Sequence, residues 1–232
     1  MLVPEAAAAA IRAGDVATLR RLLAEDPGLA TARLGPRTLL HVTTDWPGHF
    51  PNGPSTVAVL VAAGADVNAR FTGAHTETPL HWAASCDDVE VLDALLDAGA
   101  DIDAPGAVIA GGTPLDDATA FAQWRAAHRL VERGARTTLW HAATLGLMDR
   151  LRECLAADVP PAEITRAFWG ACHGGRQEAA AHLLDRGADL NWLPPWERLT
   201  PLDAAIRSGA TDLAGWLRAR GGRTAVELPG PP

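Results

Sequence analysis

The sequence of 232 residues lacks tyrosine and lysine, so all 20 of its basic residues are arginine. Its 28 acidic residues give the chain a formal net charge of -8. An acidic chain repels phosphate backbones, so this composition argues against a nucleic-acid-binding protein. Because 48% of the residues are hydrophobic and 21% are charged, we expect a folded globular chain rather than a disordered one.

Cysteine and long apolar runs are also scarce. Cys86, Cys154 and Cys172 are odd in number and far apart, and no CxxC pair occurs. This usage favours a reducing compartment over a disulfide framework, so we expect a cytoplasmic location. No run of 18 or more apolar residues is present, and the first residues lack the basic segment of a signal peptide. We therefore expect neither a membrane span nor a membrane partner.

Two short phrases recur along the chain. Residues 78–84 read TPLHWAA, and related phrases begin at residues 113 and 200, with weaker copies at residues 38 and 137. Downstream of these phrases, GADVN begins at residue 64, GADID at residue 99 and GADLN at residue 187. Recurrence at this spacing indicates a repeat protein, in which each repeat buries its apolar face against its neighbours.

The repeat that begins at Thr78 shows why the phrases predict a pair of helices. Thr78 can cap a helix, and Pro79 suits the first helical turn, where a backbone N–H is not needed. A second helix near residues 89–98 places Leu95 and its apolar neighbours on one stripe. Gly99 then supplies the left-handed residue that commonly ends a helix.

This pattern resembles the ankyrin repeat over nearly the whole chain. The resemblance implies an all-α fold, an ankyrin-repeat α-solenoid of stacked helix-turn-helix repeats with β-hairpin-like finger loops. It further implies a single ankyrin-repeat domain over residues 1–224, followed by a flexible tail over residues 225–232. The repeats are expected to begin near Glu5, Thr38, Thr78, Thr113, Thr137, Thr165 and Thr200.

One repeat departs from the family spacing. Gly64 follows Thr38 by 26 residues, whereas Gly99 follows Thr78 by 21, which leaves five extra residues in the earlier repeat. The extra residues fall within HVTTDWPGHFPNGPS, residues 41–55. A loop is predicted there instead of a helix because of five residues that oppose helix formation: Pro47, Gly48, Pro51, Gly53 and Pro54.

The resemblance also implies a concave binding face, lined by the fingers and the ends of the first helices. Tryptophan is a favoured anchor at interfaces, and several of the eight tryptophans fall on this side. The predicted ligand- or partner-binding residues are Asp45, Trp46, His49, Phe50, His75, Trp82, Cys86, Asp117, Phe121, His141, Trp169, His173, Trp192 and Trp196. His41 and His81 are instead expected to form structural hydrogen bonds between repeats, as the family phrase implies.

Two functions fit these residues. The first is a non-catalytic binding scaffold that recognises a partner protein or peptide through the concave aromatic face, as the family resemblance implies. The alternative is a small-molecule-binding or catalytic pocket closed by residues 45–55. In that pocket Asp45, His49, Asp117 and His173 would supply general acids and bases. A deep pocket would favour the alternative, and an open groove would favour the scaffold.

A metal or cofactor site is not predicted. His41, Asp45 and His49 have the spacing of ligands on one helical face, but Pro47 and Gly48 interrupt that helix. No GxSxG, phosphate-binding loop or HExxH motif occurs. We therefore favour the binding scaffold, with a partner protein or peptide. A small molecule stays open as a ligand, as does the oligomeric state.

Overall fold

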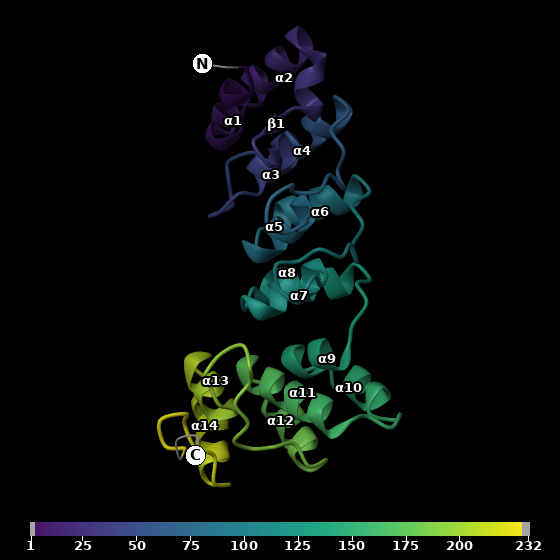
Figure 1. Cartoon of the computed structure of the whole chain (residues 1–232). Helices are drawn as coiled ribbons and strands as arrows, with labels where there is room; N and C mark the ends of the chain where they lie inside the picture. The colour runs from purple at the N-terminus through teal and green to yellow at the C-terminus, as the bar shows by residue number, and fades with distance from the viewer. Residues whose placement is uncertain (1–2, 229–232) are drawn as a thin grey trace. The chain divides into compact units, whose positions relative to one another are not determined.

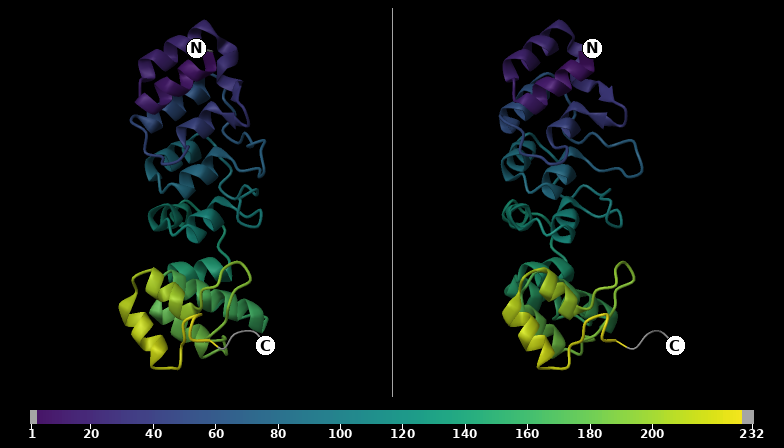
Figure 2. Two further views of the ribbon diagram at one scale, coloured as in Figure 1. Left: turned by 60° about the vertical axis from the view of Figure 1, so that its left-hand side comes forward. Right: turned by 90° about the vertical axis from the view of Figure 1, so that its left-hand side faces the viewer.

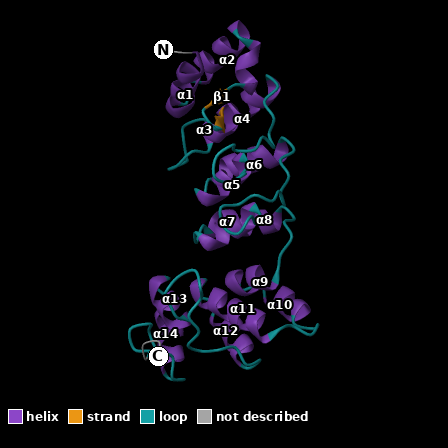
Figure 3. Cartoon of the chain, viewed as in Figure 1, coloured by secondary structure: helices purple, strands orange, loops and turns teal. Residues whose placement is uncertain are grey.

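The structure is a computed structural model that describes residues 3–228. Its contacts form two compact units, unit 1 up to Arg136 and unit 2 from Thr137, and each is described by itself. Both units consist of short helices stacked in pairs (Figure 1). The described residues are almost entirely helical, apart from loops and two short strands (Figure 3). The predicted all-α ankyrin solenoid is confirmed at this level.

Unit 1 contains four helix pairs. After the second helix, a short 3-10 turn (Pro27–Thr31) leads into an antiparallel hairpin of β1 (Arg33–Leu34) and β2 (Arg37–Thr38). The first and second helices of successive repeats pack on their counterparts, as α5 does on α7 and α4 on α6. The helices are α1 (Val3–Ala13), α2 (Val16–Glu25), α3 (Leu39–Thr43), α4 (Gly53–Ala62), α5 (Pro79–Ser85), α6 (Val89–Asp97), α7 (Pro114–Ala120) and α8 (Trp124–Glu132).

Unit 2 contains three helix pairs. Its central first helix, α11, packs against both α9 and α13 and carries the fully buried Phe168. The helices are α9 (Leu139–Leu145), α10 (Met148–Cys154), α11 (Pro161–His173), α12 (Gln177–Leu184), α13 (Pro201–Arg207) and α14 (Thr211–Arg218).

Threonines cap most of the first helices, as the phrase predicts. Thr78 and its counterparts stand at the N-cap, and each exchanges hydrogen bonds with the third helical residue. The start predicted at Thr137 is one residue early, because Thr138 caps α9. The start predicted at Thr165 is too late and falls inside a helix, because α11 already begins at Pro161.

The apolar stripes of the second helices contribute to the core together with buried residues of the first helices. Leu60, Leu95 and Leu130 are each fully buried in successive repeats of unit 1. Gly99 has a φ of +92° and ends the stripe of α6, as predicted, because a left-handed residue is strained for any side chain with a Cβ atom. No helix within residues 3–228 is long and apolar enough to cross a membrane.

The loops that connect the helices agree in most respects with the loops predicted from the sequence. Residues 44–52 form a loop between α3 and α4, although Gly53 and Pro54 already belong to the first turn of α4. The finger loops of unit 1 project from one side of its stack (Figure 2). They are closed by hairpin-like bonds such as Phe71 N–H to the Glu77 carbonyl at 2.8 Å. Near the C-terminus, Ala225 N–H donates to Asp203 at 2.8 Å; residues 229–232 lie outside the described residues, so tail flexibility stays a prediction.

Candidate functional site

His41 and His81 each link their own repeat to the finger loop of the next repeat. Thr38 N–H donates to Nδ1 of His41, so the proton of the neutral ring is on Nε2, which donates to the carbonyl of Glu77 at 3.1 Å. His81 is held in the same way by Thr78, with its Nε2 3.4 Å from the carbonyl of Gly112. Burial lowers the pKa of both rings to about 4, so they stay neutral. Their predicted structural role is confirmed.

Trp169 takes the place of this histidine in α11. Its indole Nε1 donates to the carbonyl of Leu199 at 2.8 Å, and Leu199 precedes the capping Thr200 as Glu77 precedes Thr78. The ring is only 2% exposed. The sequence placed Trp169 on an open concave face, but the structure places it in the interior, with its polar atom used between repeats.

His141, too, is placed differently from the expectation. The sequence register put it on the surface, four residues after Thr137. Since Thr138 is the true cap, His141 becomes the third helical residue and its Nδ1 accepts from Thr138 N–H at 3.1 Å. The ring is 1% exposed. It therefore corresponds to His41 and His81, the structural histidines of the other repeats.

Three predicted residues, His75, Trp82 and Asp117, converge on Glu77, which was not among the predicted site residues. Glu77 is 5% exposed and accepts from Trp82 Nε1 at 2.6 Å and from Val108 N–H at 2.8 Å. Nδ1 of His75 lies 3.1 Å from the same carboxylate. Glu77 thus joins its own helix to the finger of the next repeat.

The carboxyl of Asp117 faces Glu77 in the interior. Asp117 is fully buried, and neither of its oxygens makes a hydrogen bond of normal geometry among the described residues. The pKa of Asp117 is raised to about 8, mainly by burial and next by the negative charge of Glu77. The backbone N–H of Ile109 opposes this rise without cancelling it. Asp117 therefore carries its proton at neutral pH in most molecules, which relieves the repulsion between the two carboxyls.

The loop of residues 44–52 lies between the turns of neighbouring repeats. Asp45 is ion-paired with Arg37 at 2.5 Å and lies 3.8 Å from Arg12. Asn52 donates to the carbonyl of Gly14 at 2.9 Å, and His49 bonds to the carbonyl of Cys86 at 3.0 Å. Trp46 projects into solvent and is 82% exposed, whereas Phe50 is half-buried. Of the other predicted residues in unit 1, Phe121 is 44% exposed at the end of α7.

The four residues of the catalytic alternative have separate partners. Asp45 pairs with Arg37, His49 lies beside Asp88, and Asp117 faces Glu77. His173 belongs to unit 2, where it stacks on Trp169 at 5.4 Å.

Burial and then the nearby Asp88 raise the pKa of the Cys86 thiol to about 11, so Cys86 is a poor nucleophile at neutral pH.

None of the predicted site residues lines either of two surface hollows, one in each unit. One of about 520 Å³ in unit 1 is lined by Arg20, Leu23, Ala24, Ala58, Val59, Ala62 and Ala63. The other, of about 450 Å³ in unit 2, is lined by Gly175, Gln177, Gly209, Ala210, Thr211, Asp212 and Leu213. Both are shallow and neither contains a pair of acid–base groups.

Unit 2 presents a different kind of surface, which we call the tryptophan–arginine cluster: Trp140, Arg166, Trp192, Trp196 and Arg207. The Trp196 ring is half exposed and makes edge contacts with Trp169 at 5.8 Å and Trp192 at 5.4 Å. The Arg166 guanidinium lies 5.5 Å from the Trp140 ring and 5.7 Å from the Trp196 ring. Arg207 covers Trp169 at 5.6 Å and is ion-paired with Glu197 at 2.7 Å.

Sequence reasoning identified only part of this cluster. Trp192 and Trp196 were among the predicted binding residues, whereas Trp140 was not. Arg166 and Arg207 were not selected, although arginine close in sequence to tryptophan was an available signal. The binding role of the predicted residues stays a prediction, but the structure does bring Trp169, His173, Trp192 and Trp196 together.

Known proteins were compared with this chain in three ways. The ankyrin-repeat family model matches residues 75–107. A Caenorhabditis briggsae protein described as ankyrin repeat and KH domain-containing is 28% identical over 179 residues, which are 72% of this chain but only 7% of that much longer protein. The crystal structure of the human ASB11 ankyrin repeat domain matches with a TM-score of 0.55 and 20% identity, covering 100% of this chain and 92% of that one. The family model thus assigns an ankyrin repeat to residues 75–107, and the fold match, the repeated phrases and the stacked helix pairs support an ankyrin-repeat protein.

Proposed function

We propose that this chain is a scaffold that binds a partner protein or peptide, and that the tryptophan–arginine cluster of unit 2 is its contact surface. The observation that carries the proposal is the half-exposed ring of Trp196, which is held in place by Trp169, Trp192 and Arg166. An indole that is already ordered loses little conformational entropy on binding. Tryptophan and arginine are also the residues most enriched among interface hot spots.

The charge of the cluster narrows the partner's chemistry. Arg166 is exposed and makes no ion pair in the part of the chain that the structure describes. Its guanidinium lies over the rings of Trp140 and Trp196. A guanidinium stacked on indoles keeps its donors available for a carboxylate. The surface is therefore suited to a segment that carries an apolar side chain next to Asp or Glu.

The test starts from a peptide library displayed on phage and selected against the whole purified chain. Synthetic peptides from the selection are then titrated against the original chain and its variants. We expect Trp196→Ala to weaken binding by about 2 kcal/mol, or roughly 30-fold in Kd, and Arg166→Ala to weaken it most at low salt. Trp46→Ala is the matched control, because Trp46 is an exposed tryptophan of unit 1. Binding that depends on Trp46 and not on Trp196 would refute the assignment.

A cytoplasmic location also remains part of this proposal. Cys86, Cys154 and Cys172 are all free thiols, as is usual for proteins of reducing compartments. Fractionation of cells that express the chain fused to a fluorescent protein, with fluorescence measured in each fraction, would test the location.

A further inference from the structure

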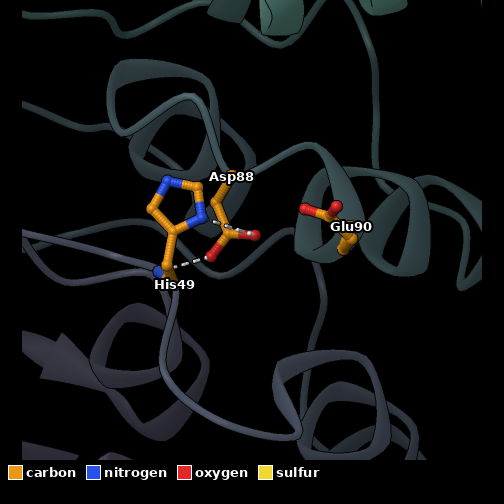
Figure 4. Close-up of side chains that lie close together, drawn as sticks. All are labelled: His49, Asp88 and Glu90. Carbon is orange, nitrogen blue, oxygen red and sulfur yellow. Dashed lines mark hydrogen bonds and ion pairs between the residues drawn. The ribbon is translucent and has the colours of Figure 1, made fainter.

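A small cluster in unit 1, separate from the proposed partner surface, has the composition of a metal site. It contains His49 from the loop of residues 44–52, Asp88 at the N-cap of α6 and Glu90 in its first turn. Each side chain offers one ligand atom, and these atoms all lie within 4.8 Å of one another. Figure 4 shows the Asp88 carboxylate between the imidazole of His49 and the carboxylate of Glu90.

The orientation of the His49 ring supplies a second, independent observation. Its Nε2 lies 3.0 Å from the carbonyl of Cys86, and a carbonyl can only accept, so Nε2 carries a hydrogen. In the neutral ring, Nδ1 therefore presents a lone pair, and it faces Oδ1 of Asp88 at 3.9 Å. A cation between these two acceptors, either a proton on the ring or a metal ion, would be favourably placed. A ring N–H fixed on a backbone carbonyl is also the usual outer contact of a metal-ligating histidine.

Asp88 is fixed just as firmly. Its side chain is 3% exposed, one oxygen accepts from the backbone N–H of His49 at 2.7 Å, and the other accepts from Val91 N–H at 3.2 Å. A carboxylate oxygen has two lone pairs, so each oxygen keeps one for a further partner. Two of the three ligands are thus held in position by the backbone before any ion binds.

The local charge balance also favours a cation. Asp88 and Glu90 together carry two negative charges, which exceed the partial positive charge of about one half at the start of a helix. A competing cation, Arg125, lies 3.8 Å from Glu90, and both side chains are more than half exposed. An exposed pair of this kind is worth little, so Glu90 can turn toward the site at low cost.

We propose that His49 Nδ1, Asp88 Oδ1 and the Glu90 carboxylate bind one divalent transition-metal ion of the Zn²⁺ class. Imidazole with carboxylates suits Zn²⁺ and its neighbours, whereas Ca²⁺ and Mg²⁺ prefer oxygen ligands alone. Metal–ligand bonds of about 2.1 Å place tetrahedral ligands about 3.4 Å apart, so the exposed Glu90 must move inward. Three protein ligands leave a fourth position for water. The ion would fasten the loop of residues 44–52 to α6 of the next repeat.

The test is calorimetric titration of the whole chain, without a histidine tag, with Zn²⁺ and separately with Co²⁺. We expect one ion per chain, and a loss of affinity of at least about tenfold in both His49→Gln and Glu90→Gln. His182→Gln, on α12 of unit 2, is the matched histidine control and should bind as the unchanged protein does. Circular dichroism of each variant confirms that it is folded. The thermal midpoint should rise with Zn²⁺ only where His49 is intact.

Visible spectra of the Co²⁺ complex separate this site from binding by a thiolate. We expect d–d bands without the sulfur charge-transfer band, and no change in Cys86→Ser. The proposal is overturned by absence of binding to the folded chain, by several weak sites, or by affinity that survives His49→Gln.

Discussion

The buried carboxyl of Asp117 should make the chain less stable as the pH rises from 6.5 to 8. The pKa of Asp117 is raised from 3.8 to about 8, first by burial and then by the neighbouring Glu77. Between these two values the folded chain holds a proton that the unfolded chain has released. The contribution of Asp117 to the free energy of unfolding therefore falls as the pH rises through this window and levels off above about pH 8.

The magnitude depends on the pH range that is chosen. His41 and His81 act in the opposite sense, because their pKa values fall from 6.5 to about 4 and their stabilisation is lost as the pH drops through that range. At pH 6.5 each ring is still charged in about half of the unfolded chains, so between pH 6.5 and 8 the two histidines together add about 0.8 kcal/mol to the free energy of unfolding. One pKa unit corresponds to about 1.4 kcal/mol, so Asp117 alone removes about 1.7 kcal/mol from pH 6.5 to 8, and we expect a net loss of about 1 kcal/mol.

The assay is urea unfolding at half-unit steps of pH, on the unchanged chain and on Asp117→Asn. Asparagine does not titrate, and its amide can donate to Glu77. The variant should therefore show only the histidines' gain of about 0.8 kcal/mol above pH 6.5, and it should be the more stable protein at pH 8. Asp116→Asn is the neighbouring control. Asp116 accepts from Thr113 N–H at 2.7 Å as part of a helix cap, so its loss should lower stability similarly at every pH. Parallel profiles for the unchanged chain and Asp117→Asn would refute the reasoning.

Three further predictions concern stability and are checked by the same urea unfolding at pH 7. Trp169→Phe should cost about 1–3 kcal/mol, because it leaves the Leu199 carbonyl without its indole donor, and a cost near zero would show that the bond is unimportant. Leu95→Ala should cost about 2–5 kcal/mol, because Leu95 is fully buried between repeats; a cost below 1 kcal/mol would mean that the site collapses around the cavity. Asp45→Asn should cost less than about 1 kcal/mol, because its pair with Arg37 is partly exposed, and a larger loss would make Asp45 a brace of the loop.

The fold could be predicted from the sequence because its signals are local. Thr78, Pro79 and Gly99 act within one turn of their own helix, and each occupies its expected place. The loop of residues 44–52 was likewise predictable, since proline and glycine oppose the interior of a helix. Only its exact end was misplaced, because Gly53 and Pro54 are acceptable in a first helical turn.

The candidate site was harder to predict because it depends on contacts between repeats. Nothing near Asp117 in the sequence shows that the finger of residues 99–113 lies over Glu77 and excludes water from both carboxyls. The proximity of His49 to Asp88 was equally hard to predict, since the two residues are 39 positions apart in the sequence. The spacing of His41, Asp45 and His49 gave no such contact, because Pro47 and Gly48 interrupt the helix that would have aligned them, and His41 and Asp45 have other partners.

The misplacement of Trp169 shows what the repeated phrase encodes. The acceptors for His41, His81 and Trp169 are the carbonyls of Glu77, Gly112 and Leu199. Each of these residues directly precedes the capping threonine of the next repeat. The requirement of the fold is therefore an N–H at the edge of a flat ring, and either imidazole or indole supplies it. An alignment on the phrase TPLH misses the indole. Counting back 14 residues from Leu183 and 18 from Gly187, the same offsets that lead from Leu95 and Gly99 to His81, leads to Trp169 and would have placed it in the core.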